Sequence, residues 1–151
     1  LTRALRIDKF TASVLELVLQ EYLSEEKAVQ NIPVLRMLSE PVSEVEKRAR
    51  TLAGRIRRAG LPVKVQVVPC ESQIGGGSLP LERIPSRGVA VSPEKISVSE
   101  LEERLRRLPV PVIPRTVNDT ILLDARTLQK DDIKLLVDEL KETKILEEVM
   151  G

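Results

Sequence analysis

From about residue 41 onward, segments with the apolar spacing of a helix alternate with pairs of segments that have the spacing of strands. "VKVQVV" (Val63–Val68) and "GVAVS" (Gly88–Ser92) place apolar residues at alternate positions, which is typical of β-strands. Two more short apolar runs flank a turn signal at Asn118–Asp119. The resulting order, α-β-β-α-β-β-α, predicts an α+β domain built as a two-layer sandwich, with helices on one face of a sheet.

Two helices are predicted ahead of this domain. Apolar residues recur every three or four positions from about Lys9 to Leu23. Asp8 is the expected N-cap of this helix, because its carboxylate can accept hydrogen bonds from the free amides of the first turn. A second, short helix around Pro33 is expected to act as a hinge between two bodies.

Two serine–glutamate pairs indicate where helices of the domain begin. Ser43 with Glu46, and Ser99 with Glu102, have the S-x-x-E spacing of a capping box. In that motif the serine hydroxyl and the glutamate carboxylate each satisfy one free backbone amide. The last helix of the domain is predicted from about Lys130 to Val149.

The composition limits the chemistry that this chain can perform. With one Phe, one Tyr and no Trp the core must be aliphatic, and without His there is no imidazole for base catalysis or zinc binding. Cys70, the single cysteine, excludes disulfides and zinc–cysteine clusters, and is expected to be a small hydrophobe rather than a nucleophile. A net charge of +1 argues against a dedicated nucleic-acid module, and no apolar run is long enough for a bilayer. We therefore expect neither a metal nor a membrane as a partner.

Three consecutive glycines, Gly75, Gly76 and Gly77, precede Ser78 in the segment "ESQIGGGSLP". A nucleotide-binding P-loop would require Gly-Lys-Ser/Thr at the start of a helix, and no lysine follows here. The dinucleotide pattern G-x-G-x-x-G fails as well, because the third glycine is missing. A flexible connector and a loop whose bare backbone approaches a ligand or partner both remain open.

Arginines form the other notable patterns. Arg3 and Arg6 lie three residues apart, so two guanidinium groups could clamp an anion from one side of a turn, or could simply be solvated. Further arginines cluster toward the ends of two predicted helices, where cations complement the helix dipole. A contact with nucleic-acid phosphate is the alternative interpretation of these clusters. Their members are Arg48, Arg50, Arg55, Arg57, Arg58, Arg104, Arg106 and Arg107.

Four segments together resemble one enzyme family. They are "RALRIDKFT" (Arg3–Thr11), "IPVLRML" (Ile32–Leu38), "ESQIGGGSLP" (Glu71–Pro80) and "ILLDARTLQKDDIKLL" (Ile121–Leu136). In this order they resemble the C-terminal part of the bacterial L-seryl-tRNA(Sec) selenium transferases, and the resemblance covers essentially the whole chain. It implies that residues 1–40 are connecting helices from a large pyridoxal-phosphate domain of fold type I. Residues 41–151 would then be the small C-terminal domain.

The resemblance also implies a function for the longer enzyme. Seryl-tRNA(Sec) would be converted to selenocysteinyl-tRNA(Sec), with pyridoxal 5'-phosphate as cofactor and selenophosphate as selenium donor, in a cytoplasmic homo-oligomer built as a ring of dimers. Arg3 and Arg6 would bind the selenium-donor anion, and the segment Gly75–Ser78 would face the active site.

The chain by itself is expected to be inactive. The family's cofactor lysine lies ahead of Leu1, and Lys9 does not stand in the Schiff-base motif, so we expect no cofactor to bind here. Two alternatives remain: the small domain of another fold type I enzyme acting on a free amino acid, and a non-catalytic binding or assembly module.

Overall fold

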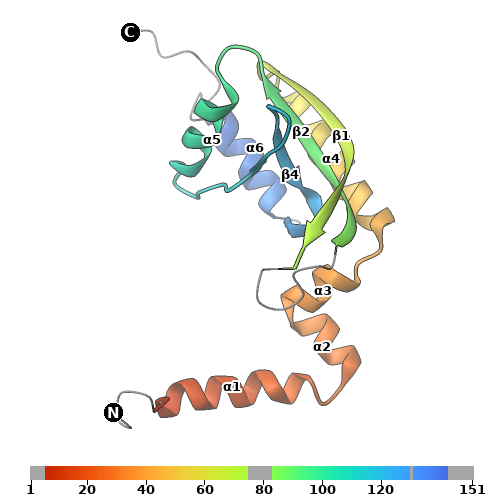
Figure 1. Ribbon diagram of the computed structural model, residues 1–151, viewed down its shortest axis with the longest axis vertical. Coiled ribbons are helices and arrows are strands. Elements are labelled where there is room, and N and C mark those ends of the chain that lie inside the picture. The colour runs from red at the N-terminus through yellow and green to blue at the C-terminus, as the bar shows by residue number, and fades with distance from the viewer. Residues whose placement is uncertain (1–5, 75–82, 130, 143–151) are drawn as a thin grey trace. The chain divides into compact units, whose positions relative to one another are not determined.

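The computed structural model describes residues 6–74, 83–129 and 131–142. The chain divides into two compact units, Leu1–Glu40 and Pro41–Gly151. The first unit holds the helices α1 (Lys9–Glu21), α2 (Glu25–Asn31) and α3 (Pro33–Ser39) (Figure 1). The second unit holds, in order, α4 (Val42–Arg58), β1 (Val63–Gln73), β2 (Arg83–Pro93), α5 (Val98–Arg106), β3 (Arg115–Thr116), β4 (Ile121–Asp124), the 3-10 turn η1 (Ala125–Thr127) and α6 (Asp132–Glu142).

The first unit confirms the predicted helix cap and adds a helix that the pattern did not reveal. Asp8 accepts hydrogen bonds from the backbone amide of Thr11 at 2.9 Å and from its hydroxyl at 2.7 Å. α2 was not predicted; it begins after Ser24, whose side chain accepts from the third amide of the helix. The short helix around Pro33 is present as α3, and its role as a hinge stays a prediction.

The second unit confirms the predicted α+β fold. Its strands form one antiparallel sheet in the order β1-β2-β4-β3. β1 and β2 pair along their whole lengths, up to Gln73 opposite Arg83, and are longer than predicted. The predicted turn at Asn118–Asp119 joins β3 to β4, and both residues have positive φ (49° and 54°), a conformation that Asn and Asp tolerate well.

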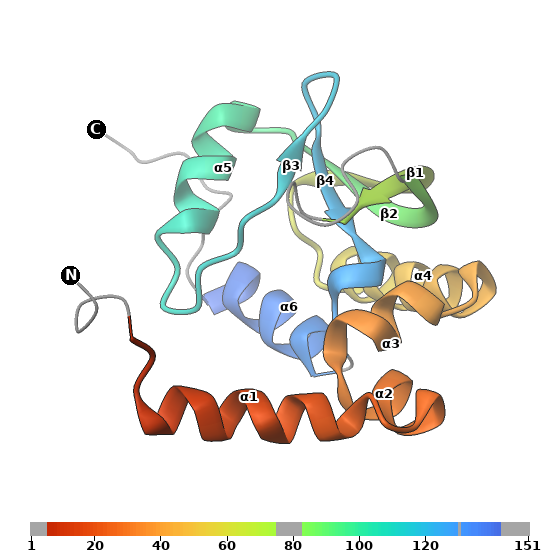
Figure 2. The ribbon, with the colours of Figure 1, turned by 60° about the horizontal axis from the view of Figure 1, so that its bottom comes forward.

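The core is aliphatic, as the composition requires. Figures 1 and 2 show α4 and α6 on the same face of the sheet. α4 buries one stripe at helical spacing, and burying each large aliphatic side chain contributes roughly 1.5–3 kcal/mol. Strands β2 and β4, with α5 and α6, supply the facing side chains. The largest fully buried apolar residues are Val45, Leu52, Ile56, Val89, Leu101 and Ile121.

Both predicted capping boxes are wrong. α4 begins at Val42 behind Pro41, and no side chain caps it. α5 begins two residues earlier than predicted, because Ser97 rather than Ser99 accepts from a first-turn amide, that of Glu100, at 3.1 Å. The earlier start brings Val98 into the core together with two leucines of α5, so burial selects between the two serines.

The last predicted helix is present as α6, which covers Asp132–Glu142. Asp131 forms a turn ahead of it, and Lys130 and residues 143–149 of the predicted range lie outside the described residues. Over the described ranges, no helix is both long enough and apolar enough to cross a membrane.

Candidate functional site

The residues predicted to bind an anion or approach a ligand are not brought together among the described positions. Arg3 and the segment Gly75–Ser78 lie outside the described residues. Arg6 is exposed and precedes α1 in the first unit. Because Gln73 and Arg83 pair at the ends of β1 and β2, the glycine run belongs to the connection between these two strands.

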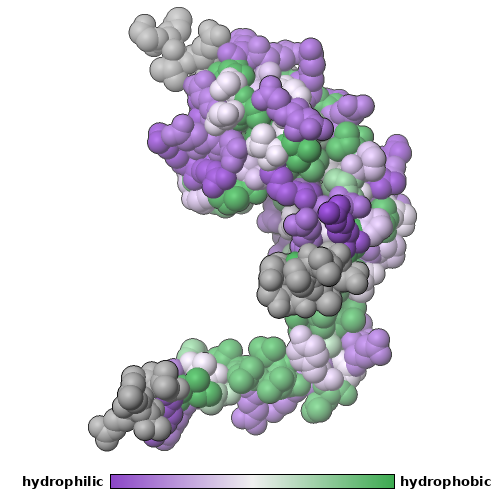
Figure 3. All heavy atoms as spheres, in the orientation of Figure 1, coloured by the Kyte–Doolittle hydropathy of each residue, from purple (hydrophilic) through white to green (hydrophobic). Residues whose placement is uncertain are grey.

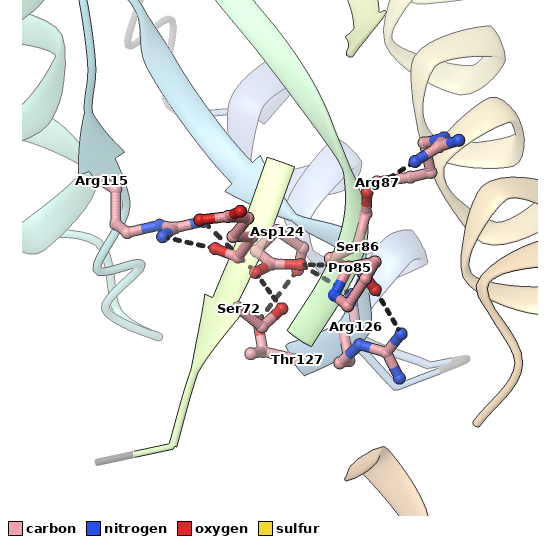
Figure 4. A network of polar contacts seen from close by, with 9 residues as sticks. Ser72, Pro85, Ser86, Arg87, Arg115, Asp124, Arg126 and Thr127 are labelled. Carbon is pink, nitrogen blue, oxygen red and sulfur yellow. Dashed lines mark hydrogen bonds and ion pairs between the residues drawn. The ribbon is translucent and has the colours of Figure 1, made fainter. Parts of the chain in front are cut away.

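A cluster of polar side chains instead gathers around Asp124, the last residue of β4 (Figure 4). Ser72 donates its hydroxyl to Oδ2 of Asp124 at 2.5 Å, and Ser86 donates to Oδ1 at 2.7 Å. Arg115 donates from Nη2 to Oδ2 at 3.3 Å, and the backbone amide of Arg126 donates to Oδ1 at 3.1 Å. The carboxylate, on a side chain only 9% exposed, thus ties together β1, β2, β3 and η1. We call these five residues the Asp124 cluster.

Strand register explains why these side chains meet. Antiparallel partners share a face of the sheet, and side chains two residues apart along a strand also share it. Asp124 pairs with Gly88, and Ser86 lies two residues before that glycine. Val89 and Leu123 occupy the opposite face and are buried in the core. The Asp124 cluster therefore lies on the sheet face that does not pack against the core helices.

Gly88 permits the close approach of β4 to β2 next to the cluster. A Cβ atom at this position would lie 2.6 Å from Cδ1 of Leu122, 3.1 Å from the carbonyl of Leu123 and 3.2 Å from Sγ of Cys70. Burial raises the pKa of the Cys70 thiol, and the nearby charge of Asp124 adds to this effect. A half-buried, protonated thiol fits a packing role better than that of a nucleophile.

The residues that follow β4 are anchored as well. Arg126 is 3% exposed, and its Nη2 donates to the carbonyl of Pro85 at 2.8 Å. Thr127 donates its hydroxyl to the carbonyl of Asp124 at 2.9 Å, and Arg48 of α4 donates to the carbonyl of Ala125 at 3.0 Å. The motif "ILLDAR" thus contains the anchoring residues, although its pattern did not identify them. The sequence signal that could have pointed to these anchoring residues is an aspartate and an arginine directly after the apolar run Ile121–Leu123.

The chemistry of the cluster is that of a structural anchor. Four groups donate hydrogen bonds to the two carboxylate oxygens of Asp124, and the guanidinium of Arg115 balances its negative charge. The carboxylate is therefore not available as a general base. Ser72 and Ser86 stand close to the two ends of the glycine-containing connection. The cluster therefore fixes the positions at which that connection leaves and re-enters the sheet.

A cavity of about 490 Å³ opens beside the Asp124 cluster. Its lining combines apolar and polar side chains, and no lysine lines it. A pyridoxal-phosphate enzyme holds its cofactor through a lysine Schiff base, and this cavity supplies no such lysine. The described residues contain no group of three or more residues able to hold a metal ion. The lining residues are Ser72, Gln73, Val110, Pro111, Val112, Ile113, Pro114, Arg115, Leu122, Leu123, Asp124, Thr127, Leu128, Asp132, Leu135, Leu136 and Glu139.

Most arginines of the two predicted basic stretches have partners in the second unit. Arg104 and Arg106 of α5, and Arg107 at its C-cap, pair with glutamates four residues earlier, the favourable spacing on a helix. On α4, Arg50 pairs with Glu46 at 2.6 Å, and Arg57 donates to a backbone carbonyl of β1 at 2.7 Å. These five arginines need no external ligand to account for them.

Comparison with known proteins assigns the family. The family model described as L-seryl-tRNA selenium transferase matches residues 1–129. The chain belongs to this family. It is 44% identical over 138 residues to the L-seryl-tRNA(Sec) selenium transferase of Desulfotalea psychrophila, covering 90% of this chain and 29% of that protein. It is 42% identical over 144 residues to the enzyme of the same name from Geobacter sulfurreducens, covering 94% and 31% respectively.

The family model covers Arg6, the paired strands β1 and β2 and the Asp124 cluster, and ends before α6, whereas the match to the Geobacter sulfurreducens enzyme covers 94% of the chain. The chain spans about 30% of the length of the curated relatives it matches. The resemblance stated from the four motifs is therefore confirmed at the level of the family.

Proposed function

We propose that this chain is the C-terminal part of an enzyme that converts seryl-tRNA(Sec) to selenocysteinyl-tRNA(Sec), with selenophosphate as selenium donor. The observation that carries the proposal is the similarity to two enzymes of that name, 44% and 42% identical over 90% and 94% of the chain. Since the chain spans less than a third of those relatives, the proposed activity belongs to a longer protein. We place that protein in the cytoplasm, where charged tRNA is used, and propose that it is a homo-oligomer.

In this proposal the chain supplies orientation and charge. Arg3 and Arg6 would bind the selenium-donor anion, because two guanidinium groups can each donate paired hydrogen bonds to phosphate oxygens. The Asp124 cluster holds the two strand ends between which Gly75–Ser78 lie, and would thereby position that segment toward the reacting groups. Exposed backbone amides of a glycine segment are suited to close approach by a substrate.

Pyridoxal phosphate, when bound to the longer protein, would act as the electron sink for loss of the serine hydroxyl. We place its lysine in the longer protein outside this chain, because Lys9 does not stand in the Schiff-base motif.

The test uses the full-length protein with seryl-tRNA(Sec) and selenophosphate. Arg6→Ala should lower kcat/KM for selenophosphate roughly 10- to 100-fold, because a charge-assisted hydrogen bond contributes about 1.5–3 kcal/mol. Arg6→Lys should recover part of the loss by keeping the charge. The matched control is Arg107→Ala, an exposed arginine paired with Glu103 on α5, which should leave transfer unchanged.

Two outcomes would contradict parts of the proposal. Normal selenium transfer by both Arg3→Ala and Arg6→Ala would remove the anion-binding role. Efficient use of free serine in place of seryl-tRNA(Sec) would favour a related enzyme that acts on a small amino acid.

A further inference from the structure

A second, basic groove lies between α4 and α6, away from the Asp124 cluster. The two helices pack next to each other on one face of the sheet (Figure 2). The groove encloses about 210 Å³, and its lining contains four cations and one carboxylate. The lining residues are Arg55, Arg58, Lys134, Val137, Asp138 and Lys141.

The four cations of this groove differ from the other basic residues of α4 and α5. Arg50, Arg106 and Arg107 each form an ion pair with a glutamate four residues earlier. The groove cations are exposed and, within the part of the chain that the structure describes, none of them forms an ion pair or a side-chain hydrogen bond. The four cations outnumber the one carboxylate of the lining, and an anion bound between them would relieve the repulsion among the excess positive charges.

The backbone directs these side chains toward one another. Arg55 and Arg58 are three residues apart on α4, and Lys134 and Lys141 are two turns apart on α6, so each pair shares a helix face. The helix dipoles account for the arginines in the last turn of α4 and for Lys141 in the last turn of α6, but not for Lys134, which lies in the first turn of α6.

We propose that this groove binds the phosphodiester backbone of RNA. Cations from two helices around an open groove suit a row of phosphates, to which Arg and Lys contribute affinity without reading sequence. The choice of RNA among polyanions rests on the proposed function, whose substrate is a charged tRNA. The residue match to the family model ends at 129, so Lys134 and Lys141 lie beyond it.

The test measures binding and needs no catalysis. Fluorescence anisotropy of a labelled tRNA transcript, titrated with the protein at several salt concentrations, gives the Kd and its salt dependence. Arg55→Ala/Arg58→Ala and Lys134→Ala/Lys141→Ala should each weaken binding about tenfold at low salt. Each should also reduce the slope of log K against log salt by about 1–2, since two phosphate contacts are lost.

Two matched variants sharpen the test. Arg106→Ala/Arg107→Ala removes the same charge from paired positions on α5 and should change Kd less than about twofold. Asp138→Asn removes the carboxylate of the groove and should tighten binding about two- to threefold. Thermal melting checks that each variant is folded, which is expected because the substituted cations are exposed.

Three results would overturn the proposal. One is an unchanged affinity and salt slope in both groove variants, and another is an equal loss in the α5 control. The third is full competition by millimolar inorganic phosphate, which would indicate a site for a small anion. Failure of selenium transfer in the full-length enzyme would contradict the proposed function and not RNA binding by the groove, because the anisotropy titration measures that binding without catalysis.

Discussion

Helices α1 and α4 both carry apolar residues at helical spacing, but only α4 buries them. α4 buries five residues completely, whereas none of the residues of α1 is buried. Phe10 and Leu17 of α1 are 79% and 63% exposed, and Figure 3 shows apolar side chains on the surface of this helix. An apolar stripe therefore identifies the helix face that is suited to burial, but not the element that packs against it.

The apolar face of α4 packs against the sheet. β2 and β4 place Val89 and Ile121 opposite the stripe of α4, and α6 closes the core beside it. In the first unit, Ala28 of α2 is the only described residue that is buried. Burial of apolar area is the main stabilising term in folding, so stability should be concentrated in the second unit.

The largest expected effect is the loss of a core side chain. Leu52→Ala should lower the free energy of unfolding by about 3 kcal/mol, because Leu52 is 0% exposed and its removal leaves a cavity. Chemical denaturation followed by circular dichroism measures this change. The matched variant is Leu17→Ala on α1, which should change it by less than about 0.5 kcal/mol. Similar losses at both positions would mean that α1 contributes to the same cooperative core.

The second effect compares two aspartates that accept hydrogen bonds. Asp124→Ala should cost about 3 kcal/mol, because it leaves the buried hydroxyl of Ser86 and the guanidinium of Arg115 without their acceptor. Asp8→Ala removes an exposed N-cap and should destabilise only α1, by about 1 kcal/mol. Denaturation reports the first change, and hydrogen exchange at the Thr11 amide reports the second. An Asp124→Ala variant as stable as the wild type would contradict the anchoring role.

The third effect tests where α5 begins. Ser97→Ala should cost about 1 kcal/mol, since the Ser97 hydroxyl accepts from the amide of Glu100. Ser99→Ala, at the serine that the capping-box pattern selected, should have almost no effect. The two variants change the same residue type at positions two residues apart, so their melting temperatures can be compared directly. A larger loss for Ser99→Ala would support the start that the sequence predicted.

The two serines also show what local patterns can reveal. Asp8 was identified correctly because it directly precedes the apolar periodicity of α1, and the α+β order followed from periodicity. Ser99 was chosen wrongly because the S-x-x-E pattern ignores burial, and the burial of Val98 favours the earlier start. Glu102, the expected partner of Ser99, instead accepts from Arg106 and Thr116.

The Asp124 cluster could not be predicted because strand register creates it. Ser72 and Asp124 are separated by 52 positions in the sequence, and no local pattern links them. They meet only when β1, β2 and β4 pair in the observed register. The basic groove has the same origin, since its cations come from two helices far apart in the chain.

The smallest effect concerns the pH dependence of α1. The hydrogen bond from the Thr11 amide is the main cause that lowers the pKa of Asp8 below its ordinary value, and the Thr11 hydroxyl adds to it. A carboxylate with a lowered pKa in the folded state stabilises that state above its unfolded pKa, and the contribution is lost as pH falls through the folded value. The start of α1 should therefore fray on acidification, with a midpoint below that of a free aspartate.

Nuclear magnetic resonance titration of the Thr11 amide measures this midpoint. Asp8→Asn is the matched control, because the side-chain carbonyl of asparagine can still cap the helix but does not titrate. The amide shift of the variant should stay flat over the same pH range. A titration that persists in Asp8→Asn would assign the dependence to another carboxylate, and would show that the exposed helix α1 is not stabilised at its start by Asp8.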